Sequence, residues 1–274
     1  MKKRLLHALA ISSLLLAVCA LLFAAPSASA QEWAKQILDK SPRHMQWVDV
    51  KYDHRTVQAF IDYPQVSHKA PVILMIHEIF GMSDWVRSMA DDLAAQGYIV
   101  IAPDLLSGTG PNGGGSSSYP DRDARVKAVS MLNGDQVIAD LNATADYALK
   151  LPAANGKLAV VGFCWGGSKS FLFATQRHDL SAAFVFYGTP PKDLAAITAP
   201  VYGFYGGNDN RVSSTVPATE KAMKDLGKRY EPVIYPGAGH GFMRAGEDPG
   251  NKNPANTTAR KKALARLDKL LKQM

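Results

Sequence analysis

The sequence predicts an α/β protein with a mostly parallel central sheet and helices on both faces of that sheet. Three observations favour this class. Apolar segments of strand length alternate with segments of helical periodicity from residue 71 onward. Residues 72–76 are apolar at every position, which is typical of a strand covered on both faces. The 274 residues are 47% hydrophobic and 20% charged, a globular composition that excludes collagen-like, coiled-coil and disordered classes.

The expected elements follow one another in a regular order. The polar segment 31–46 forms an N-terminal extension, and a turn at Asp53-His54 joins the first two strands. Ser83 caps the first helix and Gly97 ends it. Strands are expected at 47–51, 57–63, 72–76, 98–102, 158–161, 182–187, 201–205 and 230–235, and helices at 84–96, 121–132, 135–150, 167–176, 214–227 and 256–272. No composition break marks a second domain, so we expect residues 31–274 to form a single domain.

Residues 107–119 are the one low-complexity stretch of the chain and are rich in Gly and Ser. Clusters of glycine mark turns and loops, so we expect a mobile loop there without an element of its own. Such a loop acts either as a lid or specificity segment beside a site, or as an idle part of the surface.

The basic residues do not indicate a nucleic-acid partner. Of the formal net charge of +7, Lys2, Lys3 and Arg4 contribute three, which leaves +4 for the rest of the chain without a stripe of closely spaced cations. In the last helix Leu264 and the leucines that follow it at helical spacing, Leu267 and Leu271, are expected to face the core. The basic residues of that helix are expected to form a solvated face: Arg260, Lys261, Lys262, Arg266 and Lys269.

Residues 1–30 have the pattern of a secretory signal peptide. A basic start precedes an apolar run over 14–25, and Ala28-Ser29-Ala30 supplies small residues for a signal peptidase. The run is short for a membrane span, so we expect cleavage after Ala30 and an exported protein, periplasmic or secreted, without stable membrane insertion. An uncleaved anchor and lipidation at Cys19 are the alternatives.

Cleavage would remove Cys19 and leave Cys164 as the only cysteine. A single thiol in an oxidising compartment cannot form an internal disulfide and is a liability unless it is buried or used. Cys164 stands in Gly162-Phe163-Cys164-Trp165-Gly166-Gly167, directly after the expected strand 158–161. This is the G-x-nucleophile-x-G pattern with cysteine in the serine position.

The spacing of this pattern has a steric cause. The nucleophile sits on a strained turn between a strand and a helix, where side chains two residues before and after it would collide with neighbouring backbone. The N-terminus of the following helix favours the thiolate. The alternative is a tight turn that holds a buried structural cysteine.

Two further strand ends carry candidate catalytic residues. Asp209 follows the expected strand 201–205, and His240 follows the strand 230–235. With Cys164 they give the order nucleophile, acid, histidine, which is that of α/β-hydrolases. Because the carboxyl ends of parallel strands meet at one edge of a sheet, we expect these three side chains to lie close together. His240 would then take the thiol proton, and Asp209 would orient the imidazole. The alternatives are a turn-forming aspartate and a histidine satisfied within a polar network.

A carboxylate also ends the strand 72–76, in His77-Glu78-Ile79-Phe80-Gly81. No H-E-x-x-H motif occurs and the seven histidines are scattered, so we expect no metal site. An ionised Glu78 beside a thiol would disfavour the thiolate and thereby slow its oxidation. An ordinary surface glutamate is the alternative.

Residues from about 45 to 272 resemble the dienelactone hydrolase family, a branch of the α/β-hydrolases. The resemblance rests on four segments: Glu78-Ile79-Phe80-Gly81, Gly162-Phe163-Cys164-Trp165-Gly166-Gly167, Gly207-Asn208-Asp209 and Gly239-His240-Gly241-Phe242. It implies the α/β-hydrolase fold and an esterase or lactonase that resembles carboxymethylenebutenolidase and uses no cofactor.

The resemblance also implies roles for residues around the thiol. Glu78 would contact the resting thiol and help to activate it when substrate arrives. The backbone N–H groups of Ile79 and Trp165 would form the oxyanion hole.

The family holds a substrate carboxylate with two arginines. Arg244, four residues after His240, matches one of them, and Arg125 is the best match to the other, with Arg122 as the alternative. The expected partner is therefore a small ester or lactone, neutral or anionic. A broad-specificity esterase is the alternative enzyme, and a non-catalytic exported small-molecule binder is the alternative of a different class.

Overall fold

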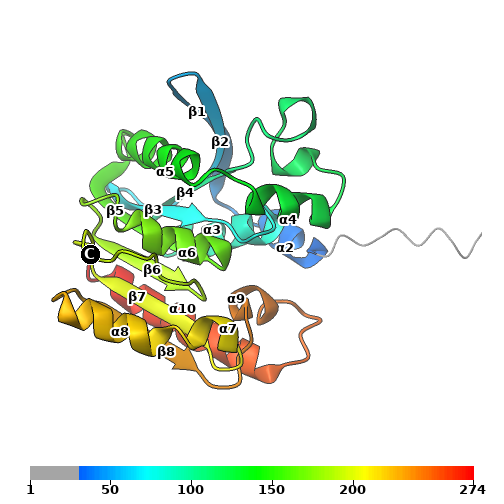
Figure 1. Ribbon diagram of the computed structural model, residues 1–274. Helices are drawn as coiled ribbons and strands as arrows, with labels where there is room; N and C mark the ends of the chain where they lie inside the picture. Colours follow the sequence, from blue (N-terminus) through cyan, green and yellow to red (C-terminus); the bar gives the residue numbers. More distant parts are fainter. Residues whose placement is uncertain (1–30) are drawn as a thin grey trace, which may run out of the picture. The chain divides into compact units, whose positions relative to one another are not determined.

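An eight-stranded sheet runs through the computed structural model, which describes residues 31–274 (Figure 1). The expectations for residues 1–30, including the signal peptide and Cys19, lie outside the described residues. The strands are β1 (His44–Tyr52), β2 (Arg55–Tyr63), β3 (Ala70–Ile76), β4 (Ile99–Pro103), β5 (Ala154–Phe163), β6 (Ala182–Phe186), β7 (Val201–Gly206) and β8 (Tyr230–Tyr235). Their order is β1-β2-β4-β3-β5-β6-β7-β8, in which β2 pairs antiparallel with β1 and β4 and all other pairs are parallel. The predicted mostly parallel sheet is thereby confirmed.

The helices divide between the two faces of the sheet. On β3, Ile73 and Met75 join the apolar cluster that contains Leu93 of α3 and Leu267 of α10, whereas the alternate residues join the cluster of α5, α6 and α8. This two-sided burial explains why the strand is apolar at every position. The helices are α2 (Glu32–Leu38), α3 (Asp84–Ala94), α4 (Arg122–Ser130), α5 (Gly134–Leu149), α6 (Trp165–Phe173), α7 (Asn210–Ser213), α8 (Val216–Asp225), α9 (Phe242–Ala245) and α10 (Pro254–Leu271).

Local signals located the start and end of α3. The Ser83 hydroxyl accepts a hydrogen bond from the N–H of Val86, as expected of an N-terminal cap. Gly97 has a φ of +102°, a conformation that favours glycine, just beyond the end of the helix.

The N-terminal segment is more ordered than expected. Residues 31–46 hold α2 and the beginning of β1 rather than a plain extension. Ala34 is fully buried, and the Arg43 guanidinium pairs with Asp91 of α3 at 2.6 Å. These contacts join groups far apart in the sequence, so the local polar composition gave no sign of them.

The Gly- and Ser-rich stretch also differs from the expected loop without elements. It contains two short 3₁₀ helices, Pro111–Gly113 and Ser116–Ser118. The Asp104 carboxylate accepts hydrogen bonds from the backbone N–H of Ser116 at 2.7 Å and from its hydroxyl at 2.6 Å. A buried carboxylate outside the stretch therefore organises it.

The basic residues of α10 do not all form a solvated face. Leu267 and Leu271 are buried and Leu264 packs against the core, as predicted. Arg260, however, pairs with Glu247 at 2.6 Å, and Arg266 donates hydrogen bonds to the carbonyls of Gly203 and Glu231. The solvated part of the expected set consists of Lys261, Lys262 and Lys269.

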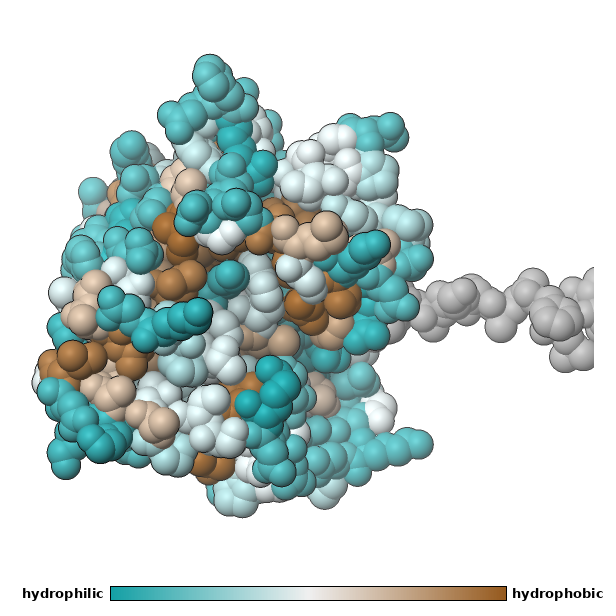
Figure 2. Space-filling model, viewed as in Figure 1, coloured by the Kyte–Doolittle hydropathy of each residue, from teal (hydrophilic) through white to brown (hydrophobic). Residues whose placement is uncertain are grey.

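Figure 2 shows hydrophilic residues over most of the face in view, with apolar residues in small separate areas. Large apolar side chains are exposed at scattered positions: Trp47, Val66, Met131, Leu226 and Ile234. Within residues 31–274 no helix combines the length and the apolar character that a membrane crossing requires.

Candidate active site

Cys164 stands on a strained turn between β5 and α6. Its φ of 57° and ψ of −117° are unusual for a residue with a side chain. A Cβ atom at Gly162 would lie 1.9 Å from the carbonyl oxygen of Gly166, and one at Gly166 would lie 2.4 Å from the carbonyl oxygen of His77. The predicted steric reason for both glycines is confirmed.

Cys164, His240 and Asp209 form a connected row. His240 Nε2 lies 3.0 Å from Cys164 Sγ, and His240 Nδ1 lies 2.5 Å from Asp209 Oδ2. The carboxylate accepts hydrogen bonds and cannot donate them, so Nδ1 carries the proton and Nε2 is left to accept one from the thiol. Three residues expected at separate strand ends are thus brought together at the carboxyl ends of β5, β7 and β8.

The thiol of Cys164 is held in its protonated form. Burial first, and the negative charge of Glu78 second, raise its pKa to about 11. The backbone N–H groups of Trp165 and Ile79 and the charge of Arg211 act in the opposite direction and lower this pKa. Both expected oxyanion-hole donors therefore face the sulfur.

Glu78 is a buried residue and not a surface glutamate. Its side chain is 3% exposed, and its Oε2 accepts a hydrogen bond from Arg244 Nε at 2.7 Å. The resemblance implied a contact between Glu78 and the resting thiol. The structure pairs the carboxylate with Arg244 and gives the thiol His240 as its hydrogen-bond partner, and the Glu78 charge lies near enough to raise the pKa of the thiol.

The three candidate substrate arginines lie differently from one another. Arg244 lines the cavity that contains Cys164, and its guanidinium carbon is 5.1 Å from the ring centre of Phe80. Arg122 covers the same ring at 4.3 Å. Neither Arg122 nor Arg125 is among the residues that line this cavity, and the buried Nε of Arg125 has no hydrogen-bond partner. Of the two, Arg122 contacts a lining residue of the cavity, Phe80.

A sequence model of the dienelactone hydrolase family matches residues 57–274. The chain belongs to this family. A Salmonella typhimurium protein named "Putative carboxymethylenebutenolidase" is 34% identical over 200 residues, covering 67% of this chain and 72% of the relative. The carboxymethylenebutenolidase of Pseudomonas putida is 30% identical over 205 residues, covering 70% of this chain and 83% of the relative.

Solved structures agree with this assignment. A Klebsiella pneumoniae structure named "Putative Dienelactone Hydrolase" has a TM-score of 0.69 and 27% identity, and the match covers 81% of this chain and 97% of that one. An acylaminoacyl peptidase of Pyrococcus horikoshii shares the fold alone, with a TM-score of 0.63 and 18% identity over 86% of this chain and 43% of that one. The predicted α/β-hydrolase fold and hydrolase class are confirmed.

In this dienelactone hydrolase family member, the thiol opens into a cavity of about 450 Å³. Five of its lining residues were not expected from the sequence: Ser168, Tyr187, Thr189, Arg211 and Val212. Tyr187 directly follows β6, has a φ of 41° and packs edge-on against the His240 ring at 5.1 Å. Position at a strand end, the signal that located the candidate triad, would also have pointed to Tyr187 and Arg211.

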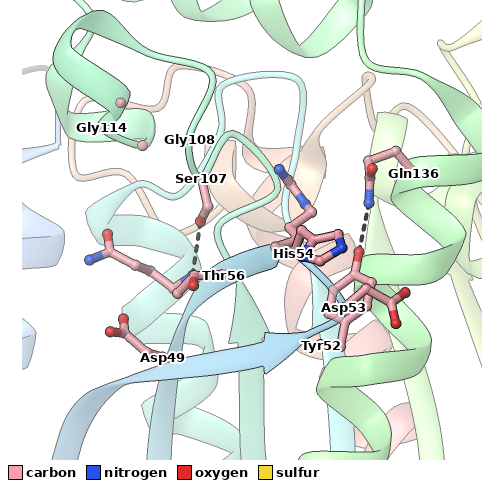
Figure 3. A pocket seen from close by; sticks show the side chains of 13 residues that line it. Asp49, Tyr52, Asp53, His54, Thr56, Ser107, Gly108, Gly114 and Gln136 are labelled. Carbon is pink, nitrogen blue, oxygen red and sulfur yellow. Dashed lines mark hydrogen bonds between the residues drawn. The ribbon is translucent and has the colours of Figure 1, made fainter.

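A larger cavity, of about 730 Å³, lies between the β1–β2 hairpin and the Gly- and Ser-rich stretch (Figure 3). Some of its polar groups pair with one another: Gln136 donates to the hydroxyl of Tyr52 at 2.6 Å, and the Ser107 hydroxyl accepts from the N–H of Gln58 at 2.9 Å. Neither Cys164 nor His240 lines this cavity, so it is separate from the dienelactone hydrolase-like site. Across residues 31–274 no group of three or more His, Cys, Asp or Glu side chains is placed to hold a metal ion.

Proposed function

We propose that this protein is an exported hydrolase of lactones or activated carboxylic esters that works through a Cys-His-Asp triad and a thioester intermediate. The observation that carries the proposal is the row of atoms from Asp209 Oδ2 through the His240 ring to Cys164 Sγ, with distances of 2.5 and 3.0 Å. A buried structural cysteine would not need an imidazole aligned by a carboxylate.

In the first half of the reaction, Cys164 Sγ attacks the carbonyl carbon and His240 Nε2 takes the thiol proton. The carbonyl oxygen becomes an oxyanion that the N–H groups of Ile79 and Trp165 stabilise. The intermediate then collapses to a thioester, and the leaving oxygen takes the proton from His240. In the second half, His240 removes a proton from water, which attacks the thioester and releases the acid and the thiol.

The choice of nucleophile limits the substrates. A thiolate is itself easily expelled from the tetrahedral intermediate, so an alkoxide or amine that leaves poorly returns the complex to substrate. An enol lactone or an aryl ester supplies a leaving group good enough to compete with sulfur. We therefore expect little cleavage of unactivated amides.

Activation of the thiol depends on Glu78 and Arg244 in this proposal. Burial and the charge of Glu78 raise the pKa of Cys164 to about 11, so this residue rests as the thiol. A substrate carboxylate that binds Arg244 competes with Glu78 for the guanidinium, and the released Glu78 carboxylate then accepts the thiol proton and passes it to His240, which delivers it to the leaving oxygen. A nucleophile formed only with substrate present is protected from oxidation, which suits a single cysteine in an exported protein.

Turnover of p-nitrophenyl acetate by the chain that starts at Gln31 tests this function. Iodoacetamide modifies one thiol in that chain, because Cys164 is its only cysteine. We expect alkylation and Cys164→Ala each to abolish turnover, and mass spectrometry of the quenched enzyme to find the acyl group on Cys164. Unchanged turnover in either case would contradict the triad, and a non-catalytic binder would show no turnover at all.

Export is tested separately. We expect the protein to be recovered from the periplasm or the medium of a bacterial host with Gln31 as its first residue. Recovery of the full-length chain from the membrane or the cytoplasm would contradict signal cleavage.

A further inference from the structure

We propose that Arg211 is an anion-binding residue of the active site, which holds the negatively charged group of an anionic substrate before that group reaches Arg244. This inference rests on the proposed function and adds a binding residue to it. Arg211 belongs to α7, which directly follows Asp209, and its side chain lines the cavity that contains Cys164, His240 and Arg244.

The guanidinium of Arg211 is free to bind an anion, whereas that of Arg244 is already paired with a carboxylate. The Arg244 guanidinium already donates to Glu78 at 2.7 Å, so an anion that binds it must compete with a buried carboxylate. Within residues 31–274 the Arg211 side chain has no acidic partner and no side-chain hydrogen bond. An incoming anion can therefore pair with Arg211 without breaking an existing ion pair.

The charge of Arg211 reaches the reacting atoms. It favours the thiolate, because it lowers the pKa of Cys164 against the effects of burial and Glu78. An arginine also suits a carboxylate by its shape, since the planar guanidinium can bind both oxygens at once. Arg211 and Arg244 both line the cavity. They belong to different elements, α7 after β7 and α9 after β8 (Figure 1).

In this proposal the two arginines bind the substrate anion one after the other. Arg211 attracts and first holds the substrate anion at no cost to Glu78. Arg244 then exchanges Glu78 for the substrate, which frees the carboxylate beside the thiol. A neutral ester gains neither interaction and so reacts with the less activated enzyme.

Alkylation of Cys164 by two reagents of similar size tests this role without turnover. Iodoacetate carries a negative charge and iodoacetamide does not, so the ratio of their rates with Cys164 reports the attraction of an anion to the site. A change in the pKa of the thiol slows or speeds both reagents equally and cancels in the ratio.

We expect Arg211→Met to lower the ratio of the iodoacetate rate to the iodoacetamide rate about three- to tenfold, as for loss of one charge near a partly screened anion. Arg211→Lys keeps the charge and should retain most of the ratio. Lys51→Met, at an exposed position on the β1–β2 hairpin, removes the same charge far along the sheet and should leave the ratio unchanged. An unchanged ratio in Arg211→Met would overturn the proposal.

A second measurement links the residue to substrate choice. We compare a p-nitrophenyl ester that ends in a carboxylate with a neutral ester of equal chain length. Arg211→Met disfavours the thiolate for both esters, but it should in addition raise KM for the anionic ester, so kcat/KM falls several-fold more for the anionic ester than for the neutral one. Equal losses for both esters would contradict an anion site. Absence of all turnover in the unaltered enzyme would contradict the proposed function, while the alkylation ratio would still report on Arg211.

Discussion

Arg244 holds Glu78 through a hydrogen bond from Nε to Oε2 of 2.7 Å, and both residues line the cavity of Cys164. The carboxylate is almost fully buried, so removal of either partner leaves a charge without compensation. One ion pair thus joins the group that keeps the thiol protonated to the group expected to bind substrate. In the proposed mechanism this pair couples substrate binding to activation of the thiol.

Glu78→Gln should lower the pKa of Cys164 below about 11, because the charge that disfavours the thiolate is removed. At a pH between neutrality and that pKa, more of the cysteine is then thiolate, and iodoacetamide reacts faster. The pH dependence of alkylation measures the change. Glu231→Gln, which removes an exposed carboxylate beside Arg229, is the matched control and should leave the profile unaltered. Identical profiles for Glu78→Gln and the unaltered enzyme would remove Glu78 from the mechanism.

Asp209→Asn should lower kcat for p-nitrophenyl acetate about 10³- to 10⁴-fold, as in other triads. The amide can donate to His240 Nδ1, which moves the ring proton to Nε2 and leaves no acceptor for the thiol. The unfolding transition should change little, because the amide keeps the shape of the carboxylate. Asp225→Asn, at an exposed position paired with Lys221, should retain full activity. Near-normal kcat in Asp209→Asn would show that the aspartate does not orient the imidazole.

Gly162→Ala should destabilise the protein by about 3 kcal/mol or more, or prevent folding, because the new methyl group overlaps the Gly166 carbonyl oxygen. Gly134→Ala is the matched control at the first residue of α5, where a Cβ would meet no atom within 4 Å. That change should be neutral or slightly stabilising, since alanine is the better helix former. Urea unfolding followed by circular dichroism compares the two. Equal stabilities would argue against a tight turn at Cys164.

Asp62 predicts a pH dependence of stability that is independent of catalysis. Its side chain is fully buried on β2, its carboxyl oxygens have no hydrogen-bond partner, and burial together with the charge of Asp91 raises its pKa from 3.8 to about 8. The folded state therefore binds this proton more tightly than the unfolded chain. The contribution of Asp62 to stability is complete below its unfolded pKa and is lost as the pH rises from about 4 to about 8.

Asp62→Asn removes this titration and keeps the side chain's shape. Between about pH 5 and about pH 9 the variant should lose less free energy of unfolding than the unaltered protein, by about 2 kcal/mol or more. Urea unfolding at the two pH values measures the difference. Parallel losses in both proteins would show that Asp62 ionises freely in the folded state.

Local spacing along the chain was sufficient to locate the strained turn at Cys164. Gly162 and Gly166 are required because a side chain at either position would collide with backbone atoms within a few residues or at the end of the adjoining strand. The spacing of the two glycines therefore predicts the turn. Position after an apolar strand was likewise sufficient for Asp209 and His240, because parallel strands deliver their carboxyl ends to one edge of the sheet. The alternation of strands and helices determined the fold class for the same reason.

The pairing of charges was decided by the folded structure alone. Glu78 and Arg244 are 166 residues apart, and the alignment of Arg122 rather than Arg125 with Phe80 depends on how α4 packs. Residues 107–119 are held in place by hydrogen bonds to Asp104, which lies outside the stretch. In α10, Arg260 and Arg266 bind groups of other elements instead of facing solvent. Electrostatic and hydrogen-bond partners are set by distance in space, and side chains far apart in the sequence leave no periodic or compositional mark of such contacts.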